Sequence, residues 1–504
     1  NAEEDFLPVR ILFSHISSLI GNLGPKPLPL IGNAHHLLLG RLRGKSNVDV
    51  MRDWKEQFGN VYTMWLGPLP VVLVCDYQTA HDAFIKNGDA HAGRQVTFVK
   101  SKIREGFDGL IHNEGPGWQE QRRFSLQTLR NFGVGKNIMQ LRILEEANFR
   151  FEKLDKQIAG EVDQKIVIDP APLFDLLIGS IVNKLLAGYR YDESNIQEFR
   201  ALKHNIDVAF DNFTAMDFII FNEFTYKLPI LRERWNVVSQ PVWDVRKMMK
   251  KQIEARQAAI ESGQHVLDFE SSGDDYIDAF LIEIEKRKQN NEELGSFNVE
   301  YLATNLMDLW TAGMETTIST LLWTFIYLLN YPEVQEKARK ELFSLTQGNR
   351  SVELMDKPFL PYTNAVITES LRCGNVLNFN LFHKVTTATV VGDFLLPKGT
   401  ITTYQQSVIM TDENAFSDAQ KVPNNALSST EKTLEKQVIP FGIGKRSCLG
   451  ESLARAELFL IIANFLQRYE VSTPEGCDPP SMQQIRLDAV TKRVIPYKMV
   501  VRKV

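Results

Sequence analysis

One short segment, residues 441–450, limits what this chain can fold into more than any other. It reads Phe-Gly-Ile-Gly-Lys-Arg-Ser-Cys-Leu-Gly and places Cys448 in a glycine-punctuated loop, just before a predicted helix that begins near Leu449. A thiolate at Cys448 would be stabilised by the helix N-terminus, by nearby backbone N–H groups and by the positive charge of Arg446. Such surroundings favour a sulfur that stays deprotonated and binds a metal.

Two other interpretations of this loop are weaker. A lone cysteine is most often an inert core residue, but three further motifs described below agree with a metal ligand. The pair Gly444-Lys445 is similar to the end of a phosphate-binding loop. However, Ile439 stands where the first glycine of that loop is needed, and Arg446 stands where Ser or Thr would bind magnesium. We therefore reject a phosphate loop.

Composition and charge describe an ordinary globular protein of 504 residues. Hydrophobic residues make up 44% and charged residues 24%, which provides ample material for a core. The net charge of −5 gives no overall basic footprint, so we expect no nucleic-acid partner. The wide, irregular spacing of the cysteines resembles neither a disulfide framework nor a zinc site and indicates a reducing compartment. These cysteines are Cys75, Cys373, Cys448 and Cys477.

We expect residues 1–24 to form a separate N-terminal segment. The chain starts at Asn1 rather than Met, which indicates trimming at the front. Residues 1–24 include several charged side chains and no apolar run of about 20 residues that could span a bilayer. The apolar segment 9–13 is compatible with the remnant of a membrane anchor or with a short interfacial helix.

The order of elements predicts a mainly helical chain with a smaller β-rich lobe, an α+β arrangement. Two β-rich runs, 61–66 and 71–74, flank Gly67-Pro68 and indicate a hairpin. Helical periodicity then dominates to about residue 372, and its clearest long helix runs from about 299 to 329. Near the C-terminus we expect strands at 386–391, 394–396 and 494–501 and a helix at 451–469.

The predicted long helix carries a polar notch, Ala312-Gly313-Met314-Glu315-Thr316-Thr317. Glycine and adjacent threonines are poor helix formers. A glycine lets another group approach the backbone closely, and a threonine hydroxyl can bond a carbonyl one turn earlier. By itself, this motif also fits a helix kink that has no chemical role.

Two residue pairs at helical spacing complete the set of motifs. Glu369 and Arg372 are three residues apart and share one side of a helix, so they can pair. Trp118 and Arg122 are four residues apart, which points an indole N–H and a guanidinium the same way. Alone, the first pair is common on solvated helix faces, and the second also fits a core tryptophan with a surface arginine. The meaning of each pair therefore depends on the cysteine loop.

Together these motifs resemble those of the cytochrome P-450 family. The cysteine loop matches the pattern F-x-x-G-x-R-x-C-x-G, and the others match A-G-x-[DE]-T, E-x-x-R and W-x-x-x-R. The resemblance runs from about residue 25 to the end and implies one two-lobed catalytic domain over 25–504. It also implies the cytochrome P-450 fold, with haem b between the long central helix and the cysteine loop.

The resemblance implies roles for individual residues. Cys448 would be the axial ligand of the haem iron, while Thr316 would hydrogen-bond the oxygen species and Glu315 would help to deliver protons. Arg104, Trp118, Arg122, His383 and Arg446 would meet the haem propionates. The full set of expected cofactor-binding residues is Arg104, Trp118, Arg122, Ala312, His383, Phe441, Arg446, Cys448 and Gly450.

The activity implied by the resemblance is that of a haem-thiolate monooxygenase. One oxygen atom from dioxygen would enter a small apolar substrate. Electrons would come from NADPH through a partner flavoprotein similar to NADPH-cytochrome P-450 reductase, because no dinucleotide-binding G-x-G-x-x-G is evident. A candidate basic face for this partner consists of Arg123, Arg130, Lys136 and Lys445. The alternative is that these four are simply solvated surface charges.

Residues 122–133 resemble animal microsomal members of the drug- and lipid-metabolising type. This similarity implies a place on the cytoplasmic face of the endoplasmic reticulum membrane, with a membrane surface as a further partner. Steroid, fatty acid and xenobiotic substrates all remain open.

Two departures from the family pattern keep alternatives open. Asn425 stands where many members carry an arginine that joins the Glu369–Arg372 pair, and asparagine cannot replace a bidentate charge. Asn378 stands where many members carry proline, and we expect it near the substrate. The alternatives to a monooxygenase are a haem-thiolate isomerase or dehydratase and, given Asn425, a non-catalytic or defective haem-binding protein.

Overall fold

The computed structural model describes residues 24–95, 97–133, 137–161, 163–271, 273–416 and 432–504. The α-helices there are α2 (Ala34–Leu42), α3 (Asn47–Phe58), α4 (Tyr77–His81), α5 (Phe98–Ile103), α6 (Gly109–His112), α7 (Gly115–Asn131), α8 (Asn137–Ala159), α9 (Ala171–Ala187), α10 (Ile196–Asn212), α11 (Ala215–Ile220), α12 (Pro229–Glu261), α13 (Tyr276–Gln289), α14 (Val299–Asn330), α15 (Pro332–Thr346), α16 (Pro361–Gly374), α17 (Gln406–Ile409), α18 (Lys432–Glu435) and α19 (Glu451–Arg468). Short helical turns of other types are η1 (Asp82–Lys86), η2 (Thr225–Lys227), η3 (Leu354–Phe359) and η5 (Gly444–Arg446). The strands are β1 (Val61–Leu66), β2 (Leu69–Val74), β3 (Gly93–Arg94), β4 (Lys165–Ile168), β5 (His383–Lys384), β6 (Thr389–Val391), β7 (Phe394–Leu396), β8 (Ile401–Tyr404), β9 (Tyr469–Ser472) and β10 (Met499–Lys503).

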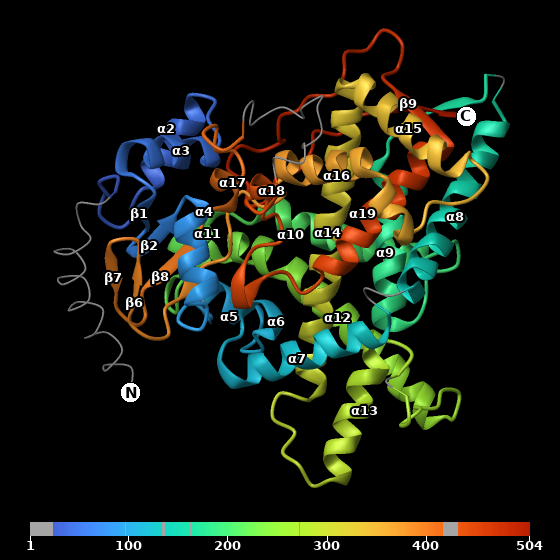
Figure 1. The fold of residues 1–504 in the computed structure, drawn as a ribbon. Helices are drawn as coiled ribbons and strands as arrows, with labels where there is room; N and C mark the ends of the chain where they lie inside the picture. Colours follow the sequence, from blue (N-terminus) through green and yellow to red (C-terminus); the bar gives the residue numbers. More distant parts are fainter. Residues whose placement is uncertain (1–23, 96, 134–136, 162, 272, 417–431) are drawn as a thin grey trace.

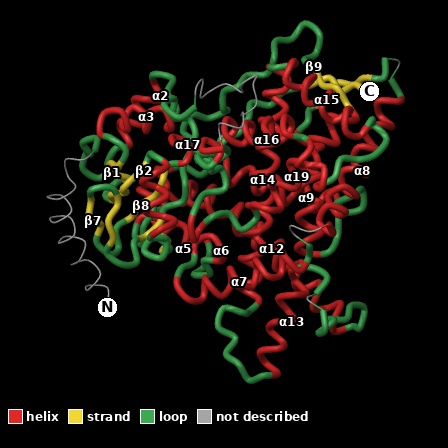
Figure 2. The backbone as a smooth tube through the Cα atoms, viewed as in Figure 1, coloured by secondary structure: helices red, strands yellow, loops and turns green. Residues whose placement is uncertain are grey.

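The molecule divides into a large helical body and a smaller strand-rich lobe (Figure 1 and Figure 2). The lobe holds a five-stranded sheet in the order β1-β2-β8-β5-β3 and the β6–β7 hairpin, with α2 and α3 beside them. A three-stranded sheet, β4-β10-β9, lies with the C-terminus on the far side of the helical body. The predicted α+β class is therefore confirmed.

The predicted strands are present, but two of them are shorter than expected. β1 and β2 pair antiparallel from Val61↔Val74 to Leu66↔Leu69, and β8 then pairs parallel with β2. The strand expected at 386–391 begins at Thr389, because the N–H of Thr386 donates to Ala90 O instead. The strand expected at 494–501 begins at Met499, since Pro496 cannot donate to a ladder.

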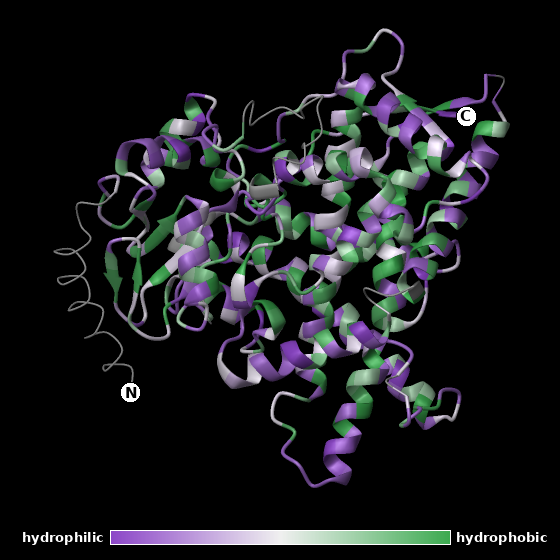
Figure 3. Ribbon diagram, viewed as in Figure 1, coloured by the Kyte–Doolittle hydropathy of each residue, from purple (hydrophilic) through white to green (hydrophobic). Residues whose placement is uncertain are grey.

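The long helix α14 forms the centre of the helical body. It is apolar on nearly every side and packs against α9, α12, α16 and α19. Figure 3 shows hydrophobic residues concentrated along α9, α14 and their neighbours, whereas the outer end of α13 is hydrophilic. In the middle of α14, the partly exposed residues include Leu309, Ala312, Gly313 and Thr316, which we call the α14 stripe. Their spacing of three or four residues puts them on one face of the helix.

Some features of the sequence fall outside the described residues. The expected N-terminal segment, 1–24, lies outside them except for Gly24, and so do Asn425 and Lys136. In the part of the chain that the structure describes, no helix combines the length and the apolarity needed to cross a bilayer.

Candidate active site

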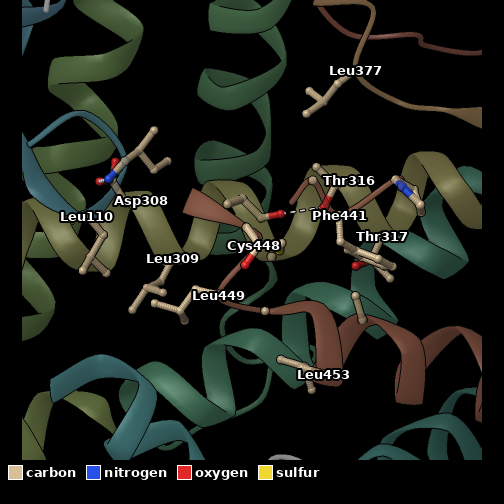
Figure 4. A pocket seen from close by; sticks show the side chains of 18 of the residues that line it. Leu110, Asp308, Leu309, Thr316, Thr317, Leu377, Phe441, Cys448, Leu449 and Leu453 are labelled. Atoms are coloured by element: carbon tan, nitrogen blue, oxygen red, sulfur yellow. Dashed lines mark hydrogen bonds between the residues drawn. The ribbon is translucent and has the colours of Figure 1, made fainter. Parts of the chain in front are cut away.

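A cavity of about 310 Å³ lies between α14 and the loop that leads into α19 (Figure 4). The α14 stripe lines it from one helix, and Phe441, Cys448 and Gly450 line it from the loop. The rest of its wall is mainly aliphatic, with side chains such as Leu449 and Leu453. The fold thus brings the cysteine loop and the polar notch, which are far apart in the sequence, into one cavity.

Two glycines shape the cysteine loop. Gly442 and Gly444 have φ angles of 71° and 79°, a conformation that costs other residues free energy. A Cβ at Gly444 would lie 2.0 Å from the carbonyl oxygen of Phe84, so no larger residue fits there. The N–H of Cys448 donates to Phe441 O at 2.8 Å and closes the loop. The loop therefore presents the Cys448 side chain to the cavity in a fixed position.

Cys448 differs from the other three cysteines in its surroundings. The Cys448 side chain is exposed to the cavity, yet desolvation by the surrounding protein and the charge of Glu451 raise the pKa of its thiol. The backbone N–H groups of Gly450 and Glu451 and the charge of Arg122 lower it. A bound metal ion removes the thiol proton outright and so reverses the effect of burial. The thiols of Cys75 and Cys373 are buried away from the cavity, and burial raises the pKa of each to about 12. Cys477 is exposed and does not line the cavity, which leaves Cys448 as the candidate ligand.

Three guanidinium groups, those of Arg94, Arg122 and Arg446, line the same cavity. Burial, followed by repulsion from Arg94 and Arg122, lowers the pKa of Arg446 to about 8. Among the described residues, none of the three forms an ion pair with a carboxylate; each donates to backbone carbonyls. The Nη1 atom of Arg446 is buried and has no hydrogen-bond partner among the residues that the structure describes. This concentration of unmatched positive charge favours an anionic ligand.

Backbone contacts fix these cations in place. Arg122 Nη2 donates to Ser447 O at 2.7 Å, and Arg446 Nε donates to Ala92 O at 2.8 Å. The guanidinium carbon of Arg446 lies 3.4 Å from the ring centroid of Trp118, a cation–π contact. The cations are therefore oriented before any ligand binds.

Trp118 lies in the cavity wall, but its indole N–H is already used. It donates to Leu110 O at 3.1 Å. From the sequence, this N–H is expected to meet a haem propionate. In this structure Trp118 instead supports Arg446 with its ring face.

Two residues expected at the propionates lie outside this cavity. Arg104 donates to Asp308 at 2.6 Å between Nη2 and Oδ1, and it lines a second cavity. His383 is fully buried beside His91, whose carbonyl lies 2.7 Å from Nδ1, and burial lowers the pKa of His383 well below its usual value. It lies directly across the β3–β5 ladder from Arg94, the residue that does reach the cavity.

Glu315 is also absent from the cavity wall. Its Oε1 lies 3.0 Å from Arg493 Nε, and its Oε2 lies 3.6 Å from Lys203 Nζ. Adjacent residues of an α-helix are rotated by about 100° from each other, because one turn takes 3.6 residues. Thr316 faces the cavity, so its neighbour Glu315 points in another direction. It faces a group of charged side chains that come from α9, α10 and the C-terminal segment.

Arg94 is a cavity residue that sequence reasoning missed. It lies in the two-residue strand β3, is 6% exposed and donates through Nε to Ile111 O at 3.2 Å. Its sequence context, Gly93-Arg94, is too short to form a recognisable motif. Only the pairing of β3 with β5 reveals that this arginine reaches the cavity.

Glu457 is a second cavity residue that sequence reasoning missed. It lies on α19 with 1% exposure, and its Oε1 has no hydrogen-bond partner in the described part of the chain. Thr317 Oγ1 donates to its Oε2 at 3.4 Å. Burial raises the pKa of Glu457 to about 8, so its carboxyl is protonated at neutral pH. The sequence signal that could have revealed it is a single acid in the largely apolar run 456–466.

Asn378 lines neither cavity, in contrast to the expectation from the sequence. Its side-chain nitrogen donates to Gln484 Oε1 at 2.8 Å and to Ala489 O at 2.9 Å, which ties this segment to the C-terminal region. Asn380, two residues further on, lines both cavities. The polar side chain at the cavity is therefore that of Asn380.

The second cavity, also of about 310 Å³, adjoins the first. The two share Ile111, Asp308, Asn380 and Leu381 as lining residues. The remaining wall of the second cavity is mostly aliphatic and aromatic, with many residues from α10 and α12. An apolar ligand in this chamber would lie next to the cavity of Cys448.

The fold and the site together define a haem-thiolate protein: one cysteine in an apolar cavity, with unmatched cations in the same wall. Comparisons with known proteins agree. A family model of cytochrome P450 matches residues 23–500. The protein named "Probable cytochrome P450 cyp-35D1" of Caenorhabditis elegans is 34% identical, over 94% of each chain. Cytochrome P450 2C8 of Homo sapiens is 30% identical over 94% of this chain and 91% of its own length. Cytochrome P450 2B2 of Rattus norvegicus is 32% identical over 89% and 87%.

This chain therefore belongs to the cytochrome P450 family, whose members are oxidoreductases that act as haem-thiolate monooxygenases. The residues present fit a haem. Cys448 offers a sulfur ligand for the iron, the aliphatic walls suit the flat ring, and the three guanidinium groups suit its two carboxylates. The unpartnered Nη1 of Arg446 is the donor that such a carboxylate would occupy.

We predict that Arg94 contributes more to haem retention than Arg104 does. Arg94→Gln should speed haem loss by about tenfold or more, because a hydrogen bond to a charged group contributes about 1.5–3 kcal/mol. Arg104→Gln is the matched control, since the Arg104 charge is already paired with Asp308. Haem transfer to apomyoglobin measures both rates. Equal rates, or a larger effect at Arg104, would restore the assignment made from the sequence.

Proposed function

We propose that this chain inserts one oxygen atom into small apolar organic substrates, with Cys448 as the residue that would supply a sulfur ligand to haem and NADPH-derived electrons from a flavoprotein reductase. The observation that carries the proposal is the place of Cys448, the one cysteine of the four that lines the apolar cavity. The haem, when bound, supplies oxygen activation, helped by the electron density of the thiolate. The protein's own part is to bind, orient and exclude water.

Substrate binding is assigned to the second cavity. Its wall contains aromatic side chains such as Phe210, Phe213 and Phe382 and few polar ones. Burial of apolar surface there would favour an apolar substrate by about 25 cal/mol for each Å² removed from water. The shared lining residues Ile111 and Leu381 would hold the reactive end of the substrate toward the cavity of Cys448.

Thr316 is the residue that we propose to handle protons in the cavity. Its hydroxyl donates to Ala312 O at 2.7 Å. Because a hydroxyl has one donor and two acceptor lone pairs, this bond leaves Thr316 Oγ1 to accept a hydrogen bond from the cavity side. Glu315 is held by Arg493 and Lys203, so any role in proton delivery would first require it to leave those cations.

We predict that Thr316→Ala raises hydrogen peroxide release and lowers product formed per NADPH, because the acceptor in the cavity wall is lost. Thr324→Ala is the matched control. Thr324 makes the same type of bond, to Thr320 O at 2.8 Å, on the same helix but outside both cavities. Product and peroxide are measured together with several substrates. Unchanged coupling in Thr316→Ala would refute the role.

The partner reductase and the location are proposed from the family resemblance. Arg123 and Arg130 are exposed on α7. Lys445 is exposed within the cysteine loop, with its Nζ 3.2 Å from Asp89 Oδ1. These cations support an acidic partner docking on this face. The same resemblance supports a position on the cytoplasmic face of the endoplasmic reticulum membrane for the catalytic domain 25–504.

The test of the proposed function is the carbon-monoxide difference spectrum of the reduced protein, followed by oxidation assays with NADPH and a reductase. A red-shifted Soret band with reductase-dependent product formation is the expected result. Haem without that band would overturn thiolate ligation. Conversion of a peroxide substrate without NADPH or reductase would favour the isomerase alternative instead.

A further inference from the structure

Among the described residues that line the second cavity, one cation has no matching anion. Its wall is mostly apolar, and its charged or titratable residues are few. They are Lys100, Arg104, His112, Asp308 and Asp488. Except for Lys100, each of these residues either forms an ion pair with an opposite charge or is neutral.

Both carboxylates of this wall are already paired with arginines. Asp308 Oδ1 lies 2.6 Å from Arg104 Nη2, and Asp488 Oδ2 lies 2.9 Å from Arg41 Nη1. Burial, together with Lys100 and the nearby arginines, lowers the pKa of His112 well below its usual value, so this ring is neutral. None of these groups balances the charge of Lys100.

Lys100 has no ion pair with any residue that the structure describes. Its ammonium lies over the ring of Phe218, whose centroid is 5.3 Å from Nζ. Burial, followed by repulsion from Arg94 and Arg104, lowers the pKa of Lys100 to about 7. An ammonium in an apolar chamber without an anion is costly to the fold.

The elements packed around α5 offer Lys100 no anion either. α5 contacts α11 and α12. The wall of the second cavity also includes residues of α6, α14 and the C-terminal segment, and Arg94 lies close enough to repel Lys100. Asp217 of α11 is paired with Arg234 at 2.6 Å. Arg246 of α12 is paired with Glu105 and Glu300. The charged or titratable groups that face this region are Arg94, Lys102, Arg104, Glu105, Asp108, His112, Asp217, Arg234, Arg246, Glu300, Asp308 and Asp488.

We propose that Lys100 binds the carboxylate of an apolar monocarboxylic acid, whose hydrocarbon tail fills the rest of the second cavity. This substrate class rests on the proposed function. Lys100 lines only the second cavity, whereas Ile111 and Leu381 line both. A carboxylate at Lys100 therefore directs the tail toward the cavity of Cys448, and oxidation falls on carbons away from the carboxyl group.

The test uses the haem-loaded protein and two matched probes, dodecanoic acid and dodecanamide, which differ in charge but share the same tail. Calorimetry should show that wild type prefers the acid. Lys100→Met should weaken acid binding by about tenfold to a hundredfold, since a charge-assisted hydrogen bond is lost, and should leave amide binding unchanged. Lys100→Arg should restore most of the preference.

Lys102→Met is the matched control. Lys102 lies on the same short helix but is exposed and contacts the ring of Tyr226 outside the cavity. It should bind both probes as wild type does. Lys100→Met should also keep or raise the melting temperature, because it removes an unpaired charge, whereas a merely structural lysine would lower it.

Acid binding should also depend on pH. The carboxylate binds the ammonium and not the neutral amine, so its affinity should fall as the pH rises through about 7. The affinity for the amide should stay constant over the same range.

Equal affinity of wild type for acid and amide, or equal loss of both in Lys100→Met, would overturn the carboxylate site. Either outcome would leave the proposed function intact if the carbon-monoxide spectrum and amide oxidation are normal. Loss of the thiolate band in wild type would instead overturn the proposed function, which calorimetry does not address.

Discussion

Replacing Cys448 with serine should abolish both the thiolate spectrum and substrate oxidation. Serine keeps the shape of the side chain, but its hydroxyl does not become the soft anion that a thiolate provides. The electron density that a thiolate gives to the haem iron favours O–O cleavage, so its loss removes the chemistry rather than slowing it. The reduced carbon-monoxide spectrum and product formation with NADPH and reductase measure the two effects.

The other three cysteines provide the controls. Cys477→Ser should behave as wild type, because this side chain is exposed and outside both cavities. Cys75→Ser should keep the thiolate band, although Cys75 is buried next to Tyr62. Cys373→Ser should lower stability, since Cys373 contacts Arg372 at 3.0 Å, yet it should also keep the band. A lost band in any of these three, with Cys448→Ser unaffected, would move the ligand to another cysteine.

Local spacing explains what could be predicted from the sequence. The glycines of the cysteine loop and Cys448 lie only a few residues apart. The order of residues in this short segment is therefore enough to predict the conformation of the loop. The same is true of the Glu369–Arg372 pair and of the helix that holds Thr316. The α+β class followed from periodicity, which depends on neighbouring residues only.

Contacts between distant segments explain what could not be predicted. Arg94 reaches the cavity because β3 pairs with β5. Arg104 does not reach it, because its guanidinium forms an ion pair with Asp308 of α14. The unmatched charge of Lys100 is visible only once the partners of every nearby acid are known. Such balances of charge are properties of the fold, and single-residue patterns do not contain them.

The Glu369–Arg372 pair is a buried ion pair between two residues of α16. Arg372 is 1% exposed, and its Nε lies 2.9 Å from both carboxylate oxygens of Glu369. Arg372 also donates to Met410 O at 2.8 Å and lies over the ring of Phe416 at 4.8 Å. These contacts join α16 to the segment that leads toward the cysteine loop.

Glu369→Gln should therefore destabilise the protein by about 3–5 kcal/mol, because it removes the carboxylate charge that faces the buried guanidinium of Arg372. The double variant Glu369→Leu with Arg372→Met should be less destabilised than the single variant, since two apolar side chains of similar volume leave no buried charge. Denaturant unfolding followed by circular dichroism measures both free energies, and haem content reports whether the cysteine loop is still supported. If the double variant is the less stable of the two, the pair acts through its specific hydrogen bonds, including the one from Arg372 to Met410 O, and not through the cost of an uncompensated charge.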